Sequence, residues 1–380
     1  MDDSTRQSGN AVGTTVAPVD PPPAVDHDAE IEPEDEGFGA DSDIDTDEAR
    51  SSYTRSITSS VFDYPVEYGR RYHAYRQGTY AFPNDEPELN RLDLAHILMF
   101  KSIGYRLYLA PIRPETTQRI LDIGTGTGIW AIQMADKFPH AEVIGTDLSA
   151  VQPEWLPSNV KFIVDDVESA WIDPKKYDYI FVRYMLVSIA DWPRLISNIY
   201  ELNLPSSYPL PYSILDHSLK YPNIRTNSHL TPGGYAEFQD MNGLYYADDA
   251  TYPPSSSLSR WNARFVDACE AMGRTARPGP ALEGWVRAHG GFRGVTHKRF
   301  KAPIGPWARD PHFKDVGALN LRQLLEGLEG FSLKVFCGVL GWEEGDVREL
   351  LERVRAELGG GEMHVMFDHH VVYAQKPGLQ

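Results

Sequence analysis

A glycine-rich segment carries the clearest chemical signal in this sequence. Residues 121–128 read Leu-Asp-Ile-Gly-Thr-Gly-Thr-Gly, after a run typical of a buried strand and before a run typical of a helix. Glycines at such a turn let the backbone approach a ligand closely, and the first N–H groups of the helix point toward that ligand. We therefore expect Gly124, Thr125, Gly126 and Gly128 to form a binding loop, although a glycine loop alone could be a simple tight turn.

Carboxylates at the ends of the next two expected strands strengthen this interpretation. Asp147 follows the strand expected at 142–146 and lies 19 residues after Gly128. A carboxylate at this place can accept hydrogen bonds from both ribose hydroxyls of a nucleoside. Asp166 follows the third expected strand, where a carboxylate can accept a hydrogen bond from an adenine amino group. Together these positions predict a cofactor that contains adenosine.

The charge beside the loop separates two classes of cofactor. Dinucleotide enzymes usually show Gly-x-Gly-x-x-Gly and place a pyrophosphate at the start of the helix. The loop here has Gly-x-Gly-x-Gly spacing and is preceded by Asp122. A carboxylate would repel a pyrophosphate but attracts a cationic sulfonium or ammonium group. The sequence therefore favours S-adenosyl-L-methionine (SAM) over NAD, and an NAD-linked oxidoreductase is the disfavoured alternative.

Several motifs taken together resemble the class I SAM-dependent methyltransferases, and within them the fungal LaeA-like secondary-metabolism methyltransferases. The resemblance covers roughly residues 65–250 and is looser toward the C-terminus. It rests on residues 69–75, 83–85, 91–94, 121–130, 145–149, 152–153 and 232–234. It implies a Rossmann-like α/β fold with a seven-stranded, mostly parallel sheet in the order 3-2-1-4-5-7-6. The last strand would be antiparallel, and SAM would bind at the C-terminal ends of strands one to four.

The resemblance also implies a cofactor-binding set on the loop and the strand ends: Asp122, Gly124, Thr125, Gly126, Gly128, Asp147, Leu148, Asp166, Val167 and Arg183. The glycines would frame the methionine moiety, Asp122 would lie near its amino group and Asp147 would hold the ribose. Arg183, just after the fourth strand, would face the methyl-transfer pocket. Tyr72 would close over the cofactor, although the Tyr- and Arg-rich residues 64–80 could instead form an ordinary amphipathic surface helix.

The elements that position these residues follow from hydrophobic periodicity. Apolar residues near helical spacing predict a helix at 86–109, ended by prolines. Short apolar runs bounded by turn residues predict strands at 119–123, 142–146, 160–164, 177–182 and 235–239. Further helices are expected at 129–138, 192–200, 258–272, 316–328 and 346–358, before a final strand at 363–374. Strands that alternate with helices indicate an α/β fold.

Composition divides the chain into four parts. Residues 1–50 hold fifteen acidic and two basic residues, a balance of −13 out of a net −18 for the 380 residues. With so few apolar residues, we expect 1–58 to be a disordered acidic tail with little to pack against the rest of the chain. A helical lid at 59–118, a SAM-binding core at 119–250 and a C-terminal part at 251–380 that completes the sheet would follow.

An unusual stretch separates the helix at 192–200 from the Pro-Gly-Gly turn at 232–234. The LaeA-like pattern runs almost directly from one to the other, whereas here residues 202–228 intervene with four prolines and no helical or strand period. A structureless loop of this length is uncommon inside a compact domain. This atypical insertion is therefore either a true loop or a translated intron.

Composition also limits the function. The net charge of −18 argues against direct nucleic-acid binding, and no apolar run reaches 18 residues, so we expect no membrane span. Two cysteines, no signal peptide and no metal motif indicate a reducing compartment, cytoplasmic or nuclear. The adjacent His369 and His370 would point to opposite faces of a strand, so we expect a structural role for them.

The sequence leaves the methyl acceptor open. No Lys, Asp or His pair with recognisable geometry identifies O-, N- or C-methylation, so no catalytic residue is assigned. The acceptor would be a small molecule or a protein. The alternative function is a non-catalytic regulator that retains the SAM pocket and acts through protein partners, with the acidic tail as a candidate contact.

Overall fold

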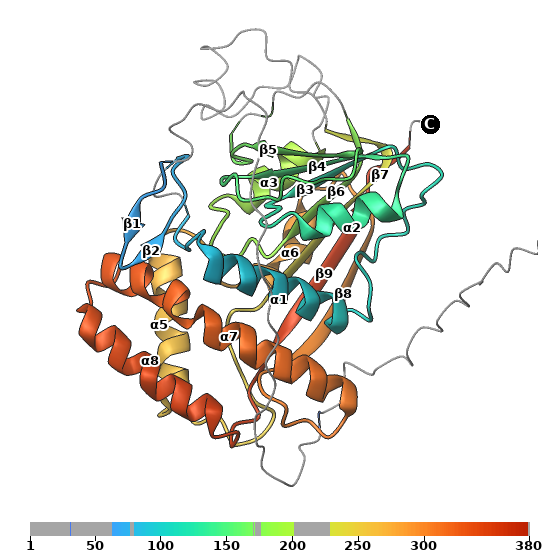
Figure 1. Ribbon diagram of the computed structural model, residues 1–380. Helices are drawn as coiled ribbons and strands as arrows, with labels where there is room; N and C mark the ends of the chain where they lie inside the picture. The colour runs from blue at the N-terminus through green and yellow to red at the C-terminus, as the bar shows by residue number, and fades with distance from the viewer. Residues whose placement is uncertain are drawn as a thin grey trace, which may run out of the picture.

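The computed structural model describes residues 31, 63–76, 80–169, 171, 176–200 and 229–378. A twisted seven-stranded sheet crosses the molecule (Figure 1). Its strands are β3 (Arg119–Ile123), β4 (Glu142–Asp147), β5 (Val160–Val164), β6 (Tyr177–Arg183), β7 (Leu230–Met241), β8 (Arg293–Pro303) and β9 (Met366–Gln375). They lie in the order β5-β4-β3-β6-β7-β9-β8, and β9 runs in the direction opposite to the other six. The strand order and the antiparallel last strand expected from the sequence are confirmed.

Both faces of the central strands are buried, as expected for parallel strands between helices. On one face α3 (Trp192–Tyr200) and α6 (Pro278–Ala288) pack over residues such as Leu121 and Ile180. On the other face α2 (Ile129–Lys137) packs over the neighbouring positions. There the indole of Trp130 stacks on Phe181 with ring centroids 3.8 Å apart. The sheet is therefore a rigid platform whose strand ends hold their positions.

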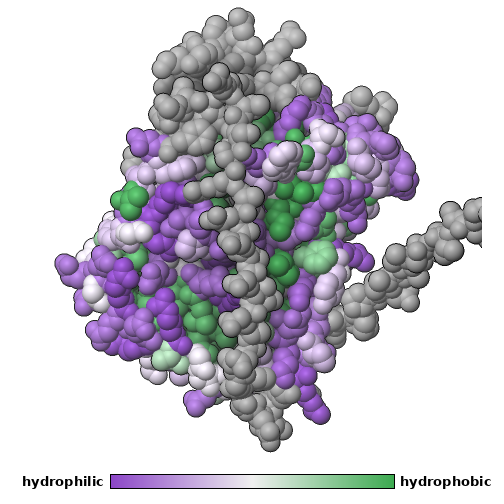
Figure 2. All heavy atoms as spheres, viewed as in Figure 1, coloured by the Kyte–Doolittle hydropathy of each residue, from purple (hydrophilic) through white to green (hydrophobic). Residues whose placement is uncertain are grey.

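A helical layer extends beyond the carboxyl ends of these strands (Figure 1). It consists of α1 (Glu86–Ser102), α5 (Ser257–Ala271), α7 (Pro311–Gly338) and α8 (Glu344–Gly359). These helices enclose the largest apolar cluster of the described residues, together with the ends of β8 and β9. The outer face of α8 is hydrophilic (Figure 2) and carries Arg–Glu pairs four residues apart. The helix expected at 346–358 is confirmed.

The first long helix is shorter than the sequence predicts. α1 ends at Ser102, because Gly104 and Tyr105 adopt left-handed backbone angles (φ +79° and +57°). The chain then runs across the sheet, where the fully buried carboxylate of Glu237 accepts hydrogen bonds from the N–H groups of Leu109 and Ala110. The apolar residues after 102 thus mimic a helix in sequence although they pack as an extended segment.

Two further sequence predictions change. The Tyr- and Arg-rich segment contains a hairpin of β1 (Val66–Glu67) and β2 (Arg70–Arg71), so the surface-helix alternative for residues 64–80 is wrong. α7 is more than twice as long as the predicted 316–328. It begins at Pro311 because the carboxylate of Asp310 accepts hydrogen bonds from the N–H groups of His312 and Phe313. The insertion at 202–228 lies outside the described residues.

The acidic tail makes one described contact with the folded part. Residues 1–30 and 32–62 lie outside the described residues, but Ile31 is buried. It packs in a small apolar cluster with Trp307, Ala308, Phe313 and Met366. The expectation that the tail has little to pack against the rest of the chain is therefore wrong at this position. A single isoleucine in a row of acidic residues gives no periodic signal, so only the fold reveals this contact.

The burial of Ile31 predicts a measurable contribution to stability. Ile31→Ser should lower the free energy of unfolding by about 1–3 kcal/mol, because it removes the apolar area that this side chain buries on folding. Urea unfolding of the full chain measures the change. Val66→Ser is the control, because Val66 is 68% exposed and should change little. Equal stability of Ile31→Ser and the parent chain would show that the contact contributes nothing.

Candidate functional site

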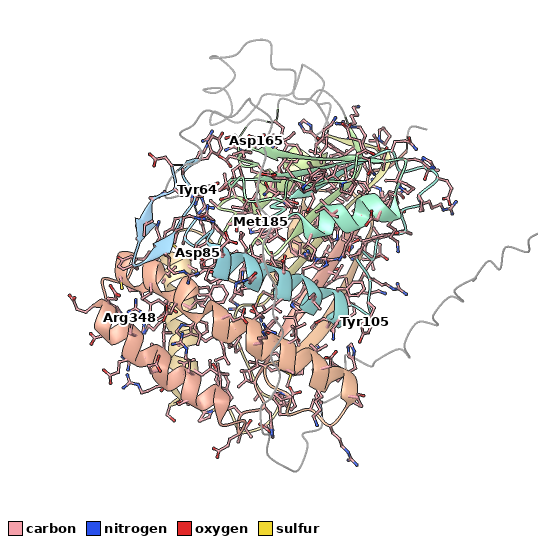
Figure 3. All side chains as sticks on the ribbon, in the orientation of Figure 1. Tyr64, Asp85, Tyr105, Asp165, Met185 and Arg348 are labelled. Atoms are coloured by element: carbon pink, nitrogen blue, oxygen red, sulfur yellow. The ribbon has the colours of Figure 1, made fainter. Side chains whose placement is uncertain are left out.

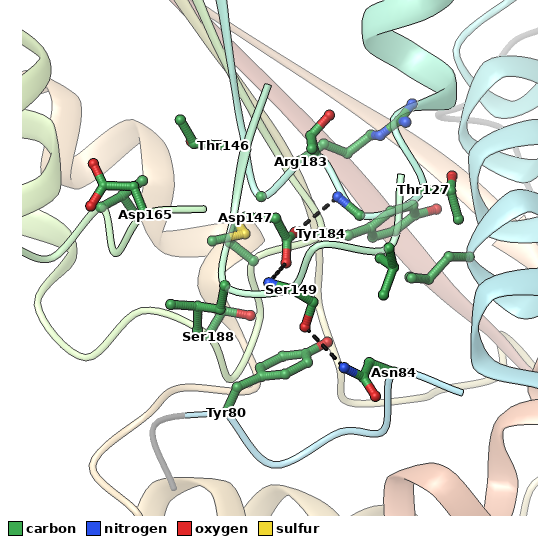
Figure 4. Close-up of a pocket in the computed structure, with 18 of the residues that line it drawn as sticks. Tyr80, Asn84, Thr127, Thr146, Asp147, Ser149, Asp165, Arg183, Tyr184 and Ser188 are labelled. Carbon is green, nitrogen blue, oxygen red and sulfur yellow. Dashed lines mark hydrogen bonds between the residues drawn. The ribbon is translucent and has the colours of Figure 1, made fainter. Parts of the chain in front are cut away.

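A pocket opens where the carboxyl ends of β3, β4, β5 and β6 meet (Figure 4). The glycine loop and the segments after β4, β5 and β6 form one side, and α1 with residues 80–84 forms the other. Eight of the eleven predicted site residues line it: Gly124, Thr125, Gly126, Asp147, Leu148, Asp166, Val167 and Arg183. Asp122, Gly128 and Tyr72 are not among its lining residues. Figure 3 labels Asp85, Met185 and Asp165, which lie in this order from α1 toward β5.

The glycine loop needs glycine for two physical reasons. Gly124, Gly126 and Gly128 all have left-handed backbone angles, with φ of +70°, +56° and +81°. A Cβ atom on Gly128 would also lie 2.4 Å from Cζ of Phe162. Gly128 therefore shapes the loop without lining the pocket, because it lets the chain turn into α2 over the Phe162 ring.

The end of β4 holds this loop in place. The carbonyl oxygen of Thr146 accepts hydrogen bonds from the N–H groups of both Gly124 and Thr125, each at 2.9 Å. One carboxylate oxygen of Asp147 accepts from the Gly126 N–H at 2.9 Å, and the other accepts from the Ser149 N–H at 3.0 Å. Burial raises the pKa of Asp147, while these backbone hydrogen bonds oppose that rise. Carboxylate oxygens have further lone pairs, so Asp147 can also accept hydrogen bonds from a ligand.

Asp122 lies behind the loop. Its carboxylate is buried and accepts a hydrogen bond from the Thr125 hydroxyl at 2.6 Å. Burial raises the pKa of Asp122 to about 7, and the Thr125 hydrogen bond and the charge of Arg183 oppose the rise. The structure therefore places Asp122 where it orients Thr125, which lines the pocket, while direct contact of Asp122 with a ligand stays a prediction.

The end of β5 supplies two carboxylates. Asp166 accepts hydrogen bonds from the Glu168 N–H and the Ser169 hydroxyl, and Arg76 lies 3.1 Å from one of its oxygens. Asp165 also lines the pocket, and burial raises the pKa of its carboxyl. Asp165 is not among the site residues that the sequence predicts. Its place beside Asp166, directly after a predicted strand, is the signal that could have identified it.

A histidine of α1 is a further residue that the sequence analysis did not find. Nη2 of Arg183 donates a hydrogen bond to Nδ1 of His96 at 2.8 Å, so the ring N–H is at Nε2, which donates to Gln133 at 3.0 Å. Burial and the Arg183 charge lower the pKa of His96 to about 3. His96 is therefore neutral near pH 7. Its spacing from Leu89 and Leu92, which also line the pocket, would have placed it on this face of α1.

The predicted lid covers the pocket with different residues. Tyr72 is fully buried outside the pocket lining, and the Lys334 ammonium lies 4.1 Å from the centre of its ring. Tyr80, Pro83 and Asn84 line the pocket instead, and the Asn84 amide donates to the Ser149 hydroxyl at 3.2 Å (Figure 4). The structure therefore does not bring Tyr72 into the pocket lining, because its ring packs against Lys334 of α7, and a contact of Tyr72 with the cofactor stays a prediction.

The two adjacent histidines of β9 reach different partners. Nε2 of His369 lies 3.0 Å from the hydroxyl of Tyr184, whereas Nδ1 of His370 lies 2.9 Å from Nε2 of His297. They belong to opposite faces of the sheet, as the alternation of strand side chains requires.

In the described part of the chain, no group of three or more His, Cys, Asp or Glu side chains could hold a metal ion. No helix of the same residues is long and apolar enough to cross a membrane.

Comparisons with known proteins agree with this architecture. Residues 94–210 match the model of a methyltransferase domain family. The chain is 43% identical over 335 residues to the methyltransferase pytC of Aspergillus terreus, covering 88% of this chain and 93% of that protein. It is 34% identical to the secondary metabolism regulator LAE1 of Cochliobolus heterostrophus, over 82% of this chain and 94% of that one. The laeA regulator of Aspergillus fumigatus is 30% identical, over 90% and 86%.

The sheet order and the glycine-loop pocket define a class I methyltransferase fold. Within this class, the chain belongs to the fungal LaeA-like family of secondary-metabolism methyltransferases.

The loop geometry predicts that two glycine-to-alanine substitutions destabilise the chain to different extents. Gly128→Ala should lower the free energy of unfolding by about 2–4 kcal/mol, because it combines a left-handed alanine with a clash against Phe162. Gly126→Ala should cost about 1 kcal/mol, because its Cβ would meet only Leu92 at 3.5 Å. Urea unfolding of both variants measures the difference, and equal losses would contradict this role of the Phe162 ring.

Asp122 predicts a change in pH dependence. The pKa of Asp122 is about 7 in the folded chain and near 4 in the unfolded chain. The folded chain therefore binds this proton more tightly, and the free energy of unfolding falls as the pH rises from about 4 through 7. Asp122→Asn keeps an oxygen acceptor for Thr125 but has no proton to lose. Its stability relative to the parent chain should therefore increase as the pH rises from 4.5 to 8. The expected relative gain in free energy of unfolding is on the order of 2 kcal/mol. A constant difference across this range would contradict the raised pKa.

Proposed function

We propose that this protein is a SAM-dependent methyltransferase that binds its cofactor in the pocket at the ends of β3 to β6. The observation that carries this proposal is the charge of the lining. Asp147, Asp165 and Asp166 lie on the strand side of the pocket, and Asp122 lies behind the glycine loop. A pyrophosphate would meet this set of carboxylates at close range, whereas a sulfonium cation is attracted by it. This supports SAM and argues against NAD.

The residues present fit this cofactor. Asp147 would accept from the ribose hydroxyls, and Asp165, Asp166 and Val167 lie further along the pocket, where the adenine would be held. Bound there, SAM would supply an electrophilic methyl group on a sulfonium, transferred by in-line displacement. The chain's own contribution is to hold two reactants in line and to exclude water, which can lower the activation barrier by several kcal/mol. His96 has both ring nitrogens in hydrogen bonds, so its role is to orient Arg183.

The relatives support a role in fungal secondary metabolism, with a methyl acceptor to be identified. The relative at 43% identity is named a methyltransferase, and those at 34% and 30% are named regulators. A regulatory function through protein partners is therefore the second candidate. Transfer of a radiolabelled methyl group from SAM to extracted metabolites or to extracted protein would support the methyltransferase, whereas transfer to neither would support the non-catalytic regulator.

The cofactor assignment predicts a selective thermal shift. S-adenosylhomocysteine should raise the melting temperature, because a ligand at one hundred times its Kd adds about 2.7 kcal/mol to the stability of the native state. NADH should leave the melting temperature unchanged. A rise with NADH and none with S-adenosylhomocysteine would overturn the assignment.

A pair of variants locates the ligand in this pocket. Asp147→Asn puts an amide where the carboxylate accepts hydrogen bonds, so the affinity for S-adenosylhomocysteine should fall by about ten- to a hundredfold. Asp136→Ala, on the exposed face of α2, is the control and should bind as the parent chain does. Calorimetry on folded protein measures both. Unchanged affinity in Asp147→Asn would mean that the ribose is held elsewhere.

A further inference from the structure

A second cavity adjoins the cofactor pocket on the side of the helical layer. It lies between α1, α5, α7 and the segments that follow β6 and β7. Tyr80, Leu92 and Tyr184 line both cavities, so these three side chains stand at the junction between them. Figure 4 shows Tyr80 and Tyr184 together within the cofactor pocket. A molecule held in the second cavity would therefore border directly on the cofactor.

Half of the described residues that line this second cavity are aromatic. Phe82 and Phe265 are stacked with ring centroids 6.2 Å apart, and Trp261 stacks on Phe265 at 5.7 Å. Phe331 meets Phe82 edge to face at 5.3 Å. The indole N–H of Trp261 donates to the Ser332 hydroxyl at 2.8 Å, so the tryptophan offers the cavity an apolar surface. Such walls favour a flat, apolar ligand, because ring-to-ring contact adds to the gain from burial.

The one charged side chain in the described lining of this cavity, Arg91, is paired with the buried carboxylate of Glu88. Its guanidinium donates to both carboxylate oxygens of Glu88 at 2.9 and 2.7 Å. Its third contact is the side-chain oxygen of Gln323 at 3.1 Å, and its plane lies 4.8 Å from the centre of the Phe331 ring. A ligand carboxylate or ammonium would leave water without gaining an opposite charge, and this desolvation opposes its binding.

The junction between the two cavities is held in one shape. Tyr184 has a left-handed backbone angle (φ +51°), which a tyrosine adopts only when its surroundings enforce it. Its N–H donates to the carbonyl of Gln239, and its hydroxyl lies 3.0 Å from Nε2 of His369. The next N–H, of Met185, donates to the buried carboxylate of Asp240 at 2.8 Å. Burial raises the pKa of the Tyr80 and Tyr184 hydroxyls, so both stay protonated and uncharged.

We propose that the second cavity holds the methyl acceptor, and that this acceptor is a neutral small molecule with a planar, largely aromatic body. The inference rests on the proposed function, because it takes the first pocket as the cofactor site. It argues against a charged lysine side chain of a protein as the acceptor, because the described lining offers an ammonium group ring faces but no carboxylate. The body of the acceptor lies among Phe82, Trp261 and Phe331, and its reactive end passes between Tyr80 and Tyr184.

Calorimetry with three naphthalene probes tests this assignment. With S-adenosylhomocysteine present, neutral 2-naphthol should bind at least about tenfold more tightly than 2-naphthoate or 1-naphthylmethylammonium, since only the charged probes pay an uncompensated desolvation cost. Equal or tighter binding of either charged probe would overturn the neutral class of acceptor. Competition by a lysine-bearing peptide against 2-naphthol would overturn the argument against a protein acceptor.

A matched pair of variants locates the probe. Leu186→Trp fills the second cavity without touching the cofactor lining, so it should weaken 2-naphthol at least about tenfold and change S-adenosylhomocysteine affinity less than twofold. Ile97→Trp introduces the same ring on α1 at a position 39% exposed and should change neither. If Leu186→Trp does not fold, Phe331→Leu removes one aromatic wall and should weaken 2-naphthol severalfold.

The outcomes separate the two proposals. Binding of 2-naphthol that is unchanged in the folded cavity variant overturns the second site, whatever the cofactor result. Failure of S-adenosylhomocysteine to bind overturns the proposed function. In that case, 2-naphthol binding that Leu186→Trp still abolishes would show an aromatic site in a protein with another activity.

Discussion

The structure depends on the hydrogen bonds between the glycine loop and the end of β4. One carbonyl oxygen, that of Thr146, accepts from two successive N–H groups, and the carboxylate of Asp147 accepts from the third. These bonds join the turn after β3 to the strand beside it, so the loop has one shape before any ligand arrives. Pre-organisation of this kind reduces the ordering cost of binding. The same carboxylate that would bind a ribose therefore also builds its own binding site.

Helix α1 connects this loop to the rest of the molecule. Leu89, Leu92 and His96 line the cofactor pocket, whereas Arg91 and Leu98 line the second cavity. The two cavities thus share one wall, and α7 packs along this helix and lines the second cavity with it. Displacing α1 would change both cavities at once. The segment after α1 is held on the sheet by the fully buried carboxylate of Glu237, which accepts hydrogen bonds from four donors.

The LaeA-like relatives include proteins named for regulation and one named for methyl transfer. The arrangement of this chain bears on that difference through the second cavity. Its aromatic wall and internally paired arginine suit a small neutral molecule better than a protein side chain. The tail contact through Ile31 lies elsewhere, beside Trp307 and Phe313. The one described contact of the tail and the pocket therefore lie in separate regions of the molecule.

The sequence by itself determined what depends on local pattern. The glycine loop, Asp147, Asp166 and the alternation of strands and helices follow from residue types at short spacing, and the resemblance supplied the strand order. Only the tertiary structure decided that Asp122 lies behind Thr125, that Tyr72 turns away, and that His96 and Tyr184 meet the pocket. These placements result from pairs of residues far apart in the chain, such as Tyr72 with Lys334 and Tyr184 with His369. The energies of these contacts come from burial and from the geometry of the two partners. Neither produces a periodic pattern in the sequence, because both exist only when the chain has folded.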